Sequence, residues 1–137
     1  VQASGNTIAG NSINATGNNS NYGIFLSNLS KYNTISNNSI STKGNAGNIG
    51  IYLNQTSTNN NITGNSIATN ATLIGYGILA GVFSDNNTIS SNSITTGYGA
   101  RNHGILVSQA SGNIITGNSI NAIPKDNNEP LVVLDNT

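Results

Sequence analysis

Several residue types are missing or scarce in this 137-residue sequence. It has no cysteine, methionine or tryptophan, and only 6% of its residues are charged, with a formal net charge of zero. Without cysteine there is no disulfide framework and no thiolate chemistry. Cysteine usage therefore does not indicate an oxidising or a reducing compartment. Four Lys and Arg residues cannot neutralise a run of phosphates, so the composition excludes a nucleic-acid partner.

Long hydrophobic runs are missing too. No apolar stretch approaches the roughly 18–20 residues of a transmembrane helix. No polybasic segment favours anionic lipids, and no signal peptide opens the sequence. We therefore expect no membrane insertion. If the protein is exported, its signal has been removed or lies outside this sequence.

The sequence does contain a repeated octapeptide. Successive copies start 27, 27, 27 and 26 residues apart. The copies are NTIAGNSI from Asn6, NTISNNSI from Asn33, NNITGNSI from Asn60, NTISSNSI from Asn87 and NIITGNSI from Asn113. A fixed period in this range is typical of stacked-repeat proteins, in which a single unit cannot bury its apolar face alone. Residues 1–137 are therefore expected to form one domain, a segment or subunit of a larger assembly.

Within each octapeptide the two isoleucines are five residues apart, as in Ile8 and Ile13. In a flat strand they would face opposite sides, so they share a core only if the chain bends between them. The residues at the bend belong to types that tolerate left-handed backbone: Gly10, Asn37, Gly64, Ser91 and Gly117.

A third segment follows in each period, beginning at Tyr22, Ile49, Tyr76, His103 and Glu129. Alternation turns one set of its residues inward: Ile24, Ile51, Ile78, Ile105 and Leu131. The prediction is an all-β fold, a parallel β-helix of about five triangular coils with three short strands each. Hairpins are disfavoured because the chain has no Asn-Gly or Asp-Gly pair, and helices are disfavoured by propensity.

The repeated N-x-I-x-x-N-S-I pattern, together with G-I-x-L, resembles the right-handed parallel β-helix repeats of pectate-lyase-like and NosD-like proteins. That superfamily includes carbohydrate-binding proteins, sugar hydrolases and microbial surface proteins, and the resemblance covers essentially the whole chain. Its lyases and hydrolases need grouped carboxylates. This chain has only Asp85, Asp126, Glu129 and Asp135, and Asp85 is alone in its rung. We expect no catalysis, no metal and no cofactor.

Stacking places equivalent residues in columns, and four columns could matter. An interior amide ladder is predicted for Asn11, Asn38, Asn65, Asn92 and Asn118. An outward serine column comprises Ser12, Ser39, Ser66, Ser93 and Ser119. A candidate lateral interface comprises Phe25, Tyr52, Leu79, Leu106 and Val132. Candidate glycan contacts are Tyr22, Tyr76 and His103, and His103 could also pair with Glu129.

Two rows of threonine raise a minor alternative, a flat ice-binding face. The rows are Thr7, Thr34 and Thr88, and Thr42, Thr69 and Thr96. Other residues interrupt or end both rows, and threonine is also simply a good strand residue.

The leading functional prediction is a non-catalytic structural or adhesive β-solenoid at a cell exterior, either a stalk segment or a self-stacking filament subunit. Its partners would be further copies or neighbouring coils. The alternative is a carbohydrate-binding or carbohydrate-active segment whose active coils lie elsewhere. Pro124, Pro130 and the charges around them predict a guarded C-terminal edge, whereas the N-terminal edge looks open.

Overall fold

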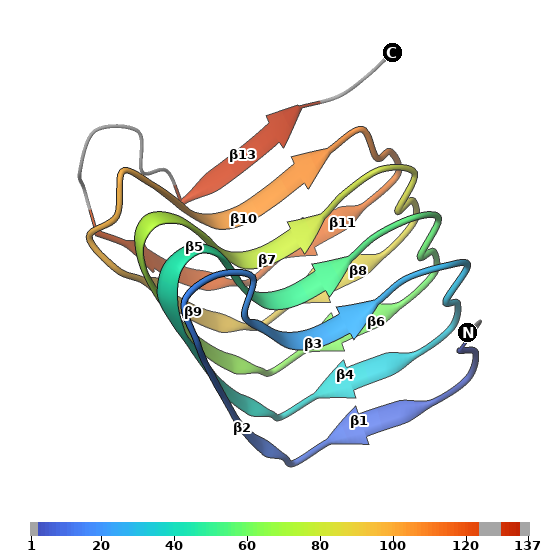
Figure 1. Ribbon diagram of the computed structural model, residues 1–137. Helices are drawn as coiled ribbons and strands as arrows, with labels where there is room; N and C mark the ends of the chain where they lie inside the picture. The colour runs from blue at the N-terminus through green and yellow to red at the C-terminus, as the bar shows by residue number, and fades with distance from the viewer. Residues whose placement is uncertain (1–2, 124–129, 135–137) are drawn as a thin grey trace.

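The computed structural model describes residues 3–123 and 130–134, with the side chains of 131–134 excepted. Its strands stack as rungs in a parallel β-solenoid, with the N-terminal rung at one end and β13 at the other (Figure 1). The described residues contain no helix. This confirms the predicted all-β solenoid.

One wall of the solenoid is a five-stranded sheet made of the first half of every octapeptide. Its strands are β1 (Thr7–Ala9), β4 (Thr34–Ser36), β6 (Asn61–Thr63), β8 (Thr88–Ser90) and β11 (Ile114–Thr116). All neighbours pair in parallel, with equivalent residues opposite one another, as in Ile8 with Ile35 and Ile35 with Ile62.

The rest of the coil is an eight-stranded sheet. Its strands are β2 (Ser12–Thr16), β3 (Tyr22–Leu26), β5 (Ser39–Leu53), β7 (Ser66–Ala80), β9 (Ser93–Thr96), β10 (Arg101–Ser108), β12 (Ser119–Ala122) and β13 (Leu131–Leu134). In this sheet β5 and β7 run through the corner that separates β2 from β3, and they curve visibly in Figure 1.

Two details of the predicted coil are therefore wrong. The chain makes about four turns of roughly 27 residues rather than five coils. In addition, two coils have two strands rather than three, because β5 and β7 stay paired through the corner. Irregularities in their pairing between Gly44 and Ala46, and between Ala46 and Asn48, absorb the bend there.

The bends inside the octapeptides form as predicted. Their φ angles are 68° at Gly10, 54° at Asn37, 66° at Gly64, 55° at Ser91 and 62° at Gly117. This left-handed conformation turns the chain between the two strands, so both isoleucines of an octapeptide point inward.

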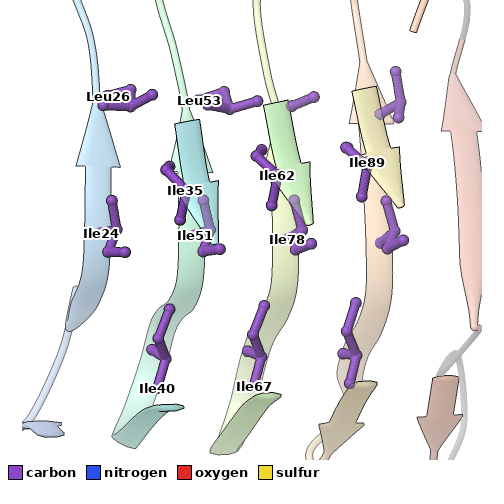
Figure 2. Packing of buried hydrophobic residues seen from close by; sticks show 14 of the residues in the cluster. Ile24, Leu26, Ile35, Ile40, Ile51, Leu53, Ile62, Ile67, Ile78 and Ile89 are labelled. Carbon is purple, nitrogen blue, oxygen red and sulfur yellow. The ribbon is translucent and has the colours of Figure 1, made fainter. Parts of the chain in front are cut away.

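The core consists of isoleucine columns that run along the solenoid. In the column Ile35, Ile62 and Ile89 every side chain is 0% exposed, and Ile40 and Ile67 are 2% exposed. Figure 2 shows these side chains repeating at equal positions from rung to rung. Each buried isoleucine stabilises the fold by about 1.5–3 kcal/mol relative to an exposed one. No coil can bury its isoleucines without the neighbouring coil.

A glycine column lets the chain pass close to this core. The glycines are Gly23, Gly50, Gly77 and Gly104. A Cβ atom on Gly50 would lie 2.3 Å from Cγ2 of Ile67 and 2.6 Å from the carbonyl oxygen of Gly77. The second neighbour is backbone and cannot move aside without breaking the rung spacing. The repeated glycine is therefore a packing requirement.

We expect Gly50→Ala to lower the free energy of unfolding by about 1–3 kcal/mol or more, as overpacked cores do. Gly10→Asn is the matched control, because Asn37 adopts the same left-handed φ in the next rung and a Cβ at Gly10 meets nothing within 4 Å. Urea unfolding followed by circular dichroism measures both. Equal stability of Gly50→Ala and the wild type would contradict this account of the column.

Candidate functional site

The predicted asparagine ladder is present and runs through all five rungs. The Nδ2 groups of Asn11, Asn38 and Asn65 each donate to Oδ1 of the ladder asparagine in the next rung, at 3.0, 3.0 and 2.9 Å. Asn92 continues the series to Asn118 at 3.0 Å. Each accepting Oδ1 also receives the backbone N–H of the donating asparagine, as between Asn38 and Asn65 at 3.0 Å. The interior amides thus bond one another as well as the backbone.

A second, parallel ladder was missed in the sequence. It consists of the first residue of every octapeptide: Asn6, Asn33, Asn60, Asn87 and Asn113. Its Nδ2 to Oδ1 distances are 3.0, 3.0, 3.0 and 3.1 Å along the series. The signal was available, because this asparagine recurs in every copy just as the first ladder does.

A third column is incomplete. Asn21 donates to Oδ1 of Asn48 at 2.7 Å. The next position is Gly75, which pairs with Asn48 on one side and with Asn102 on the other. Nδ2 of Asn48 is buried and has no hydrogen-bond partner in the part of the chain that the structure describes. A side chain does not fit at Gly75, since its Cβ would lie 2.8 Å from that of Ala71.

Both complete ladders have the same direction. Every amide donates towards the C-terminal rung and accepts from the N-terminal one. At the N-terminal edge, Oδ1 of Asn6 and of Asn11 accept no hydrogen bond from the described chain. In the last octapeptide, Nδ2 of Asn113 is buried and has no partner among the described residues, and Nδ2 of Asn118 donates to the Ile89 carbonyl, at 2.9 Å. The two ladders therefore have the same polarity along the solenoid.

The predicted lateral column stacks on the outside of the eight-stranded sheet. Register places Phe25 beside Tyr52, Tyr52 beside Leu79, and Leu79 beside Leu106. Phe25 is 47% exposed, and the other three are half-buried. The backbone of Val132 continues the column next to Leu106, but its side chain lies outside the described part. Whether this column is an interface stays a prediction.

The three candidate glycan contacts do not form one group. The Tyr22 ring lies 5.4 Å from Phe25 and 5.5 Å from Tyr52, forming an aromatic cluster on the first two rungs. Tyr76 instead stacks on His103, with ring centroids 5.7 Å apart and an 11° angle between the planes. Glu129, the suggested partner of His103, lies outside the described residues.

Burial raises the pKa of two of these tyrosines above their ordinary value of 10.0. For Tyr52 burial is the larger cause, and the neighbouring Tyr22 adds to it. For Tyr76 burial again dominates, and the positive charge of Arg101 partly opposes it. Both rings are therefore partly desolvated, which limits how much of each a ligand could reach.

The other predicted columns are placed as follows. The serine column Ser12, Ser39, Ser66, Ser93 and Ser119 is exposed on every rung. Thr42, Thr69 and Thr96 are at most 2% exposed, so this row lies inside the solenoid and cannot form an ice-binding face. Of the first row, Thr7 is exposed, and Thr34 and Thr88 are half-buried.

The charges predicted to guard the C-terminal edge lie outside the described residues, as does Pro124. They are Lys125, Asp126, Glu129 and Asp135.

One feature was not found from the sequence at all. A pocket of about 240 Å³ opens beside Tyr98, which is 69% exposed, with Asn70, Thr95 and Ile123 in its lining. Tyr98 lies in a corner that differs from the other repeats, so periodicity carried no signal for it.

In the described ranges no three His, Asp or Glu side chains gather closely enough to hold a metal ion. No helix within those ranges is long and apolar enough to cross a membrane. Comparison with models of protein families, with curated proteins and with solved structures finds no match.

We expect Asn65→Ala to lower the free energy of unfolding by about 3 kcal/mol or more. The change leaves the buried N–H groups of Asn38 without their acceptor and removes a donor from Asn92, and each orphaned group costs about 1–3 kcal/mol. Asn121→Ala, at an exposed site on β12, should change it by less than about 0.5 kcal/mol. Chemical unfolding tests the pair, and similar values for the two variants would contradict a structural role for the ladder.

The raised tyrosine pKa values predict a loss of stability at high pH. Folding holds the phenol proton of Tyr52 and Tyr76 more tightly than the unfolded chain does. The contribution of these two phenols to the free energy of unfolding is therefore complete below pH 10.0. It is lost as the pH rises through their folded-state pKa values. Urea midpoints between pH 9 and 12 should fall less steeply in the Tyr52→Phe, Tyr76→Phe double variant. Tyr98→Phe is the control, and equal slopes in double variant and wild type would refute the prediction.

Proposed function

We propose that this chain is a non-catalytic structural or adhesive β-solenoid at a cell exterior, acting as a stalk segment or a stacking rod subunit. The observation that carries the proposal is the pair of uninterrupted asparagine ladders across all five rungs. Residues repeated for rung-to-rung bonding serve a regular rod, whereas a catalytic solenoid needs irregular clusters of acids and bases on a few rungs.

The outer surface supports the same proposal. The exposed side of the coil carries serine columns and other small uncharged groups, including Ser39, Ser66 and Ser93. Such a surface stays hydrated without long flexible charged side chains. Sites that trypsin could cleave are correspondingly few, because the whole chain has only four Lys and Arg residues.

The resemblance to pectate-lyase-like β-helix repeats favours a second candidate, carbohydrate binding. Its specific support is the pocket of about 240 Å³ beside Tyr98. An exposed aromatic ring can cover the apolar face of a sugar, and the amide of Asn70 and the hydroxyl of Thr95 can bond its hydroxyl groups. Glycan-array binding that is lost on Tyr98→Ala but kept on Tyr32→Ala, another exposed tyrosine, would favour this candidate.

A rigid rod should resist trypsin. Lys43 and Arg101 lie within paired strands, and Lys31 is half-buried in a bridge with Ser4. Cleavage there requires local opening of rungs that the ladders hold together. We expect the folded chain to remain uncut at these three sites for hours under conditions that digest the urea-unfolded chain in minutes. Rapid cleavage at Lys43 in the folded chain would count against the structural-rod proposal.

A further inference from the structure

Asn70, Ala71 and Thr72 form one of the Asn-x-Ser/Thr tripeptides at which N-linked glycans are attached. They lie within β7, where successive side chains alternate between the two faces of the sheet. Asn70 and Thr72 are exposed, whereas Ala71 between them is buried. The amide that accepts a glycan and the hydroxyl that the signal requires therefore both project from the outer face.

The buried asparagines do not carry this signal. Every asparagine of the two complete ladders is followed two positions later by an isoleucine that packs in the core, as Asn33 is followed by Ile35. In the incomplete third column, Asn48 is followed at that position by Gly50. The signal is therefore confined to asparagines outside the ladders, where an attached sugar leaves the rung-to-rung hydrogen bonds intact.

One of the acceptor asparagines lies at the pocket beside Tyr98. The sequence contains eight Asn-x-Ser/Thr tripeptides, and Asn70 is the one whose asparagine lines this pocket. The backbone N–H of Gly97 donates to the Thr69 carbonyl at 2.8 Å, which places Gly97 in the rung beside Asn70. A Cβ atom on Gly97 would lie 2.7 Å from Oδ1 of Asn70. The acceptor amide thus lies directly over the residue that precedes the exposed Tyr98 ring.

The lining of the pocket suits one sugar ring. Its volume is about 240 Å³, and its lining combines the apolar groups of Ala68 and Ile123, the Tyr98 ring and the exposed Thr95. A pyranose presents C–H groups that pack on an aromatic ring and hydroxyl groups that bond to a threonine hydroxyl. The first sugar attached to Asn70 would therefore contact partners for both kinds of group.

We propose that Asn70 carries an N-linked glycan whose first sugar lies in the pocket beside Tyr98. In the attachment step, Nδ2 of Asn70 bonds to the anomeric carbon of an oligosaccharide carried on a polyprenyl pyrophosphate. The bond from this carbon to the pyrophosphate oxygen breaks, and the leaving polyprenyl pyrophosphate takes the electron pair and the proton that the amide loses. The inference rests on the proposed location at a cell exterior and adds a modification to the rod.

Tandem mass spectrometry of intact glycopeptides, from protein purified out of the cells that produce it, tests whether the glycan is present. We expect an oligosaccharide mass on Asn70 and none on Asn121. Asn121 is the matched control because it is exposed on β12 and is followed by Ala122, but it has Ile123 where the signal needs a hydroxyl. Protein in which Asn70 is unmodified in every molecule would overturn the proposal.

Variants at the hydroxyl position test the acceptor signal without touching the asparagine. In the same cells, Thr72→Val should abolish the modification of Asn70, and Thr72→Ser should keep it. Both changes are at an exposed position, so circular dichroism should show the same fold for each. Modification that persists in Thr72→Val would contradict attachment through this tripeptide.

The place of the sugar in the pocket is tested on the folded glycoprotein with an enzyme that cleaves the bond between sugar and asparagine. Packing on Tyr98 should slow this cleavage, so Tyr98→Ala should speed release from Asn70 about threefold to tenfold. Tyr32→Ala, a change at another exposed tyrosine, is the control and should leave the rate unchanged. Equal rates in the wild type and Tyr98→Ala would refute the placement in the pocket.

The same material separates failure of this inference from failure of the proposed rod. The tripeptide Asn14-Ala15-Thr16 has the same three residue types on β2, and its asparagine is not part of the pocket lining. A glycan on Asn14 with none on Asn70 would overturn the assignment to the pocket. An unmodified chain that still resists trypsin would remove the glycan and leave the rod, whereas rapid cleavage at Lys43 would count against the rod itself.

Discussion

The interaction on which this structure depends is the amide bridge between one rung and the next. An asparagine Oδ1 can accept both the side-chain and the backbone N–H of the asparagine before it, as Asn65 does for Asn38. This requires identical residues at one constant strand spacing of roughly 4.8 Å, and the isoleucines then fall into register. The corners can absorb a change in coil length, since the coil from Asn87 to Asn113 is one residue shorter than the others and both ladders continue through it in register.

Much of the fold could be predicted because stacking turns a sequence period into a spatial column. The five-residue spacing of the isoleucines predicted a bend, and the left-handed φ at Asn37 and Ser91 confirms it. The ladder through Asn11 was predicted by the same reasoning. The ladder through Asn6 has the same sequence signal, an asparagine that recurs as the first residue of every octapeptide.

Other features could not be predicted because they depend on the corners, where the repeats differ. Whether β5 continues from the second segment into the third is decided by irregular pairing around Ala46, which the octapeptide does not encode. The inward direction of the Thr42 row does not depend on that corner, because Thr42 lies two residues after the buried Ile40 on the same face of the strand. The pocket at Tyr98 lies beside a corner that resembles no other in the chain. Periodicity describes what the coils share and says nothing about their differences.

The ladders also give the rod a direction. In a fold whose units bond only to their neighbours, an interior rung is complete when it bonds to the rung on either side. Every ladder amide donates towards the C-terminal rung and accepts from the N-terminal one, as Asn38 does between Asn11 and Asn65. The direction of the asparagines thus gives the rod a polarity that its neutral surface does not.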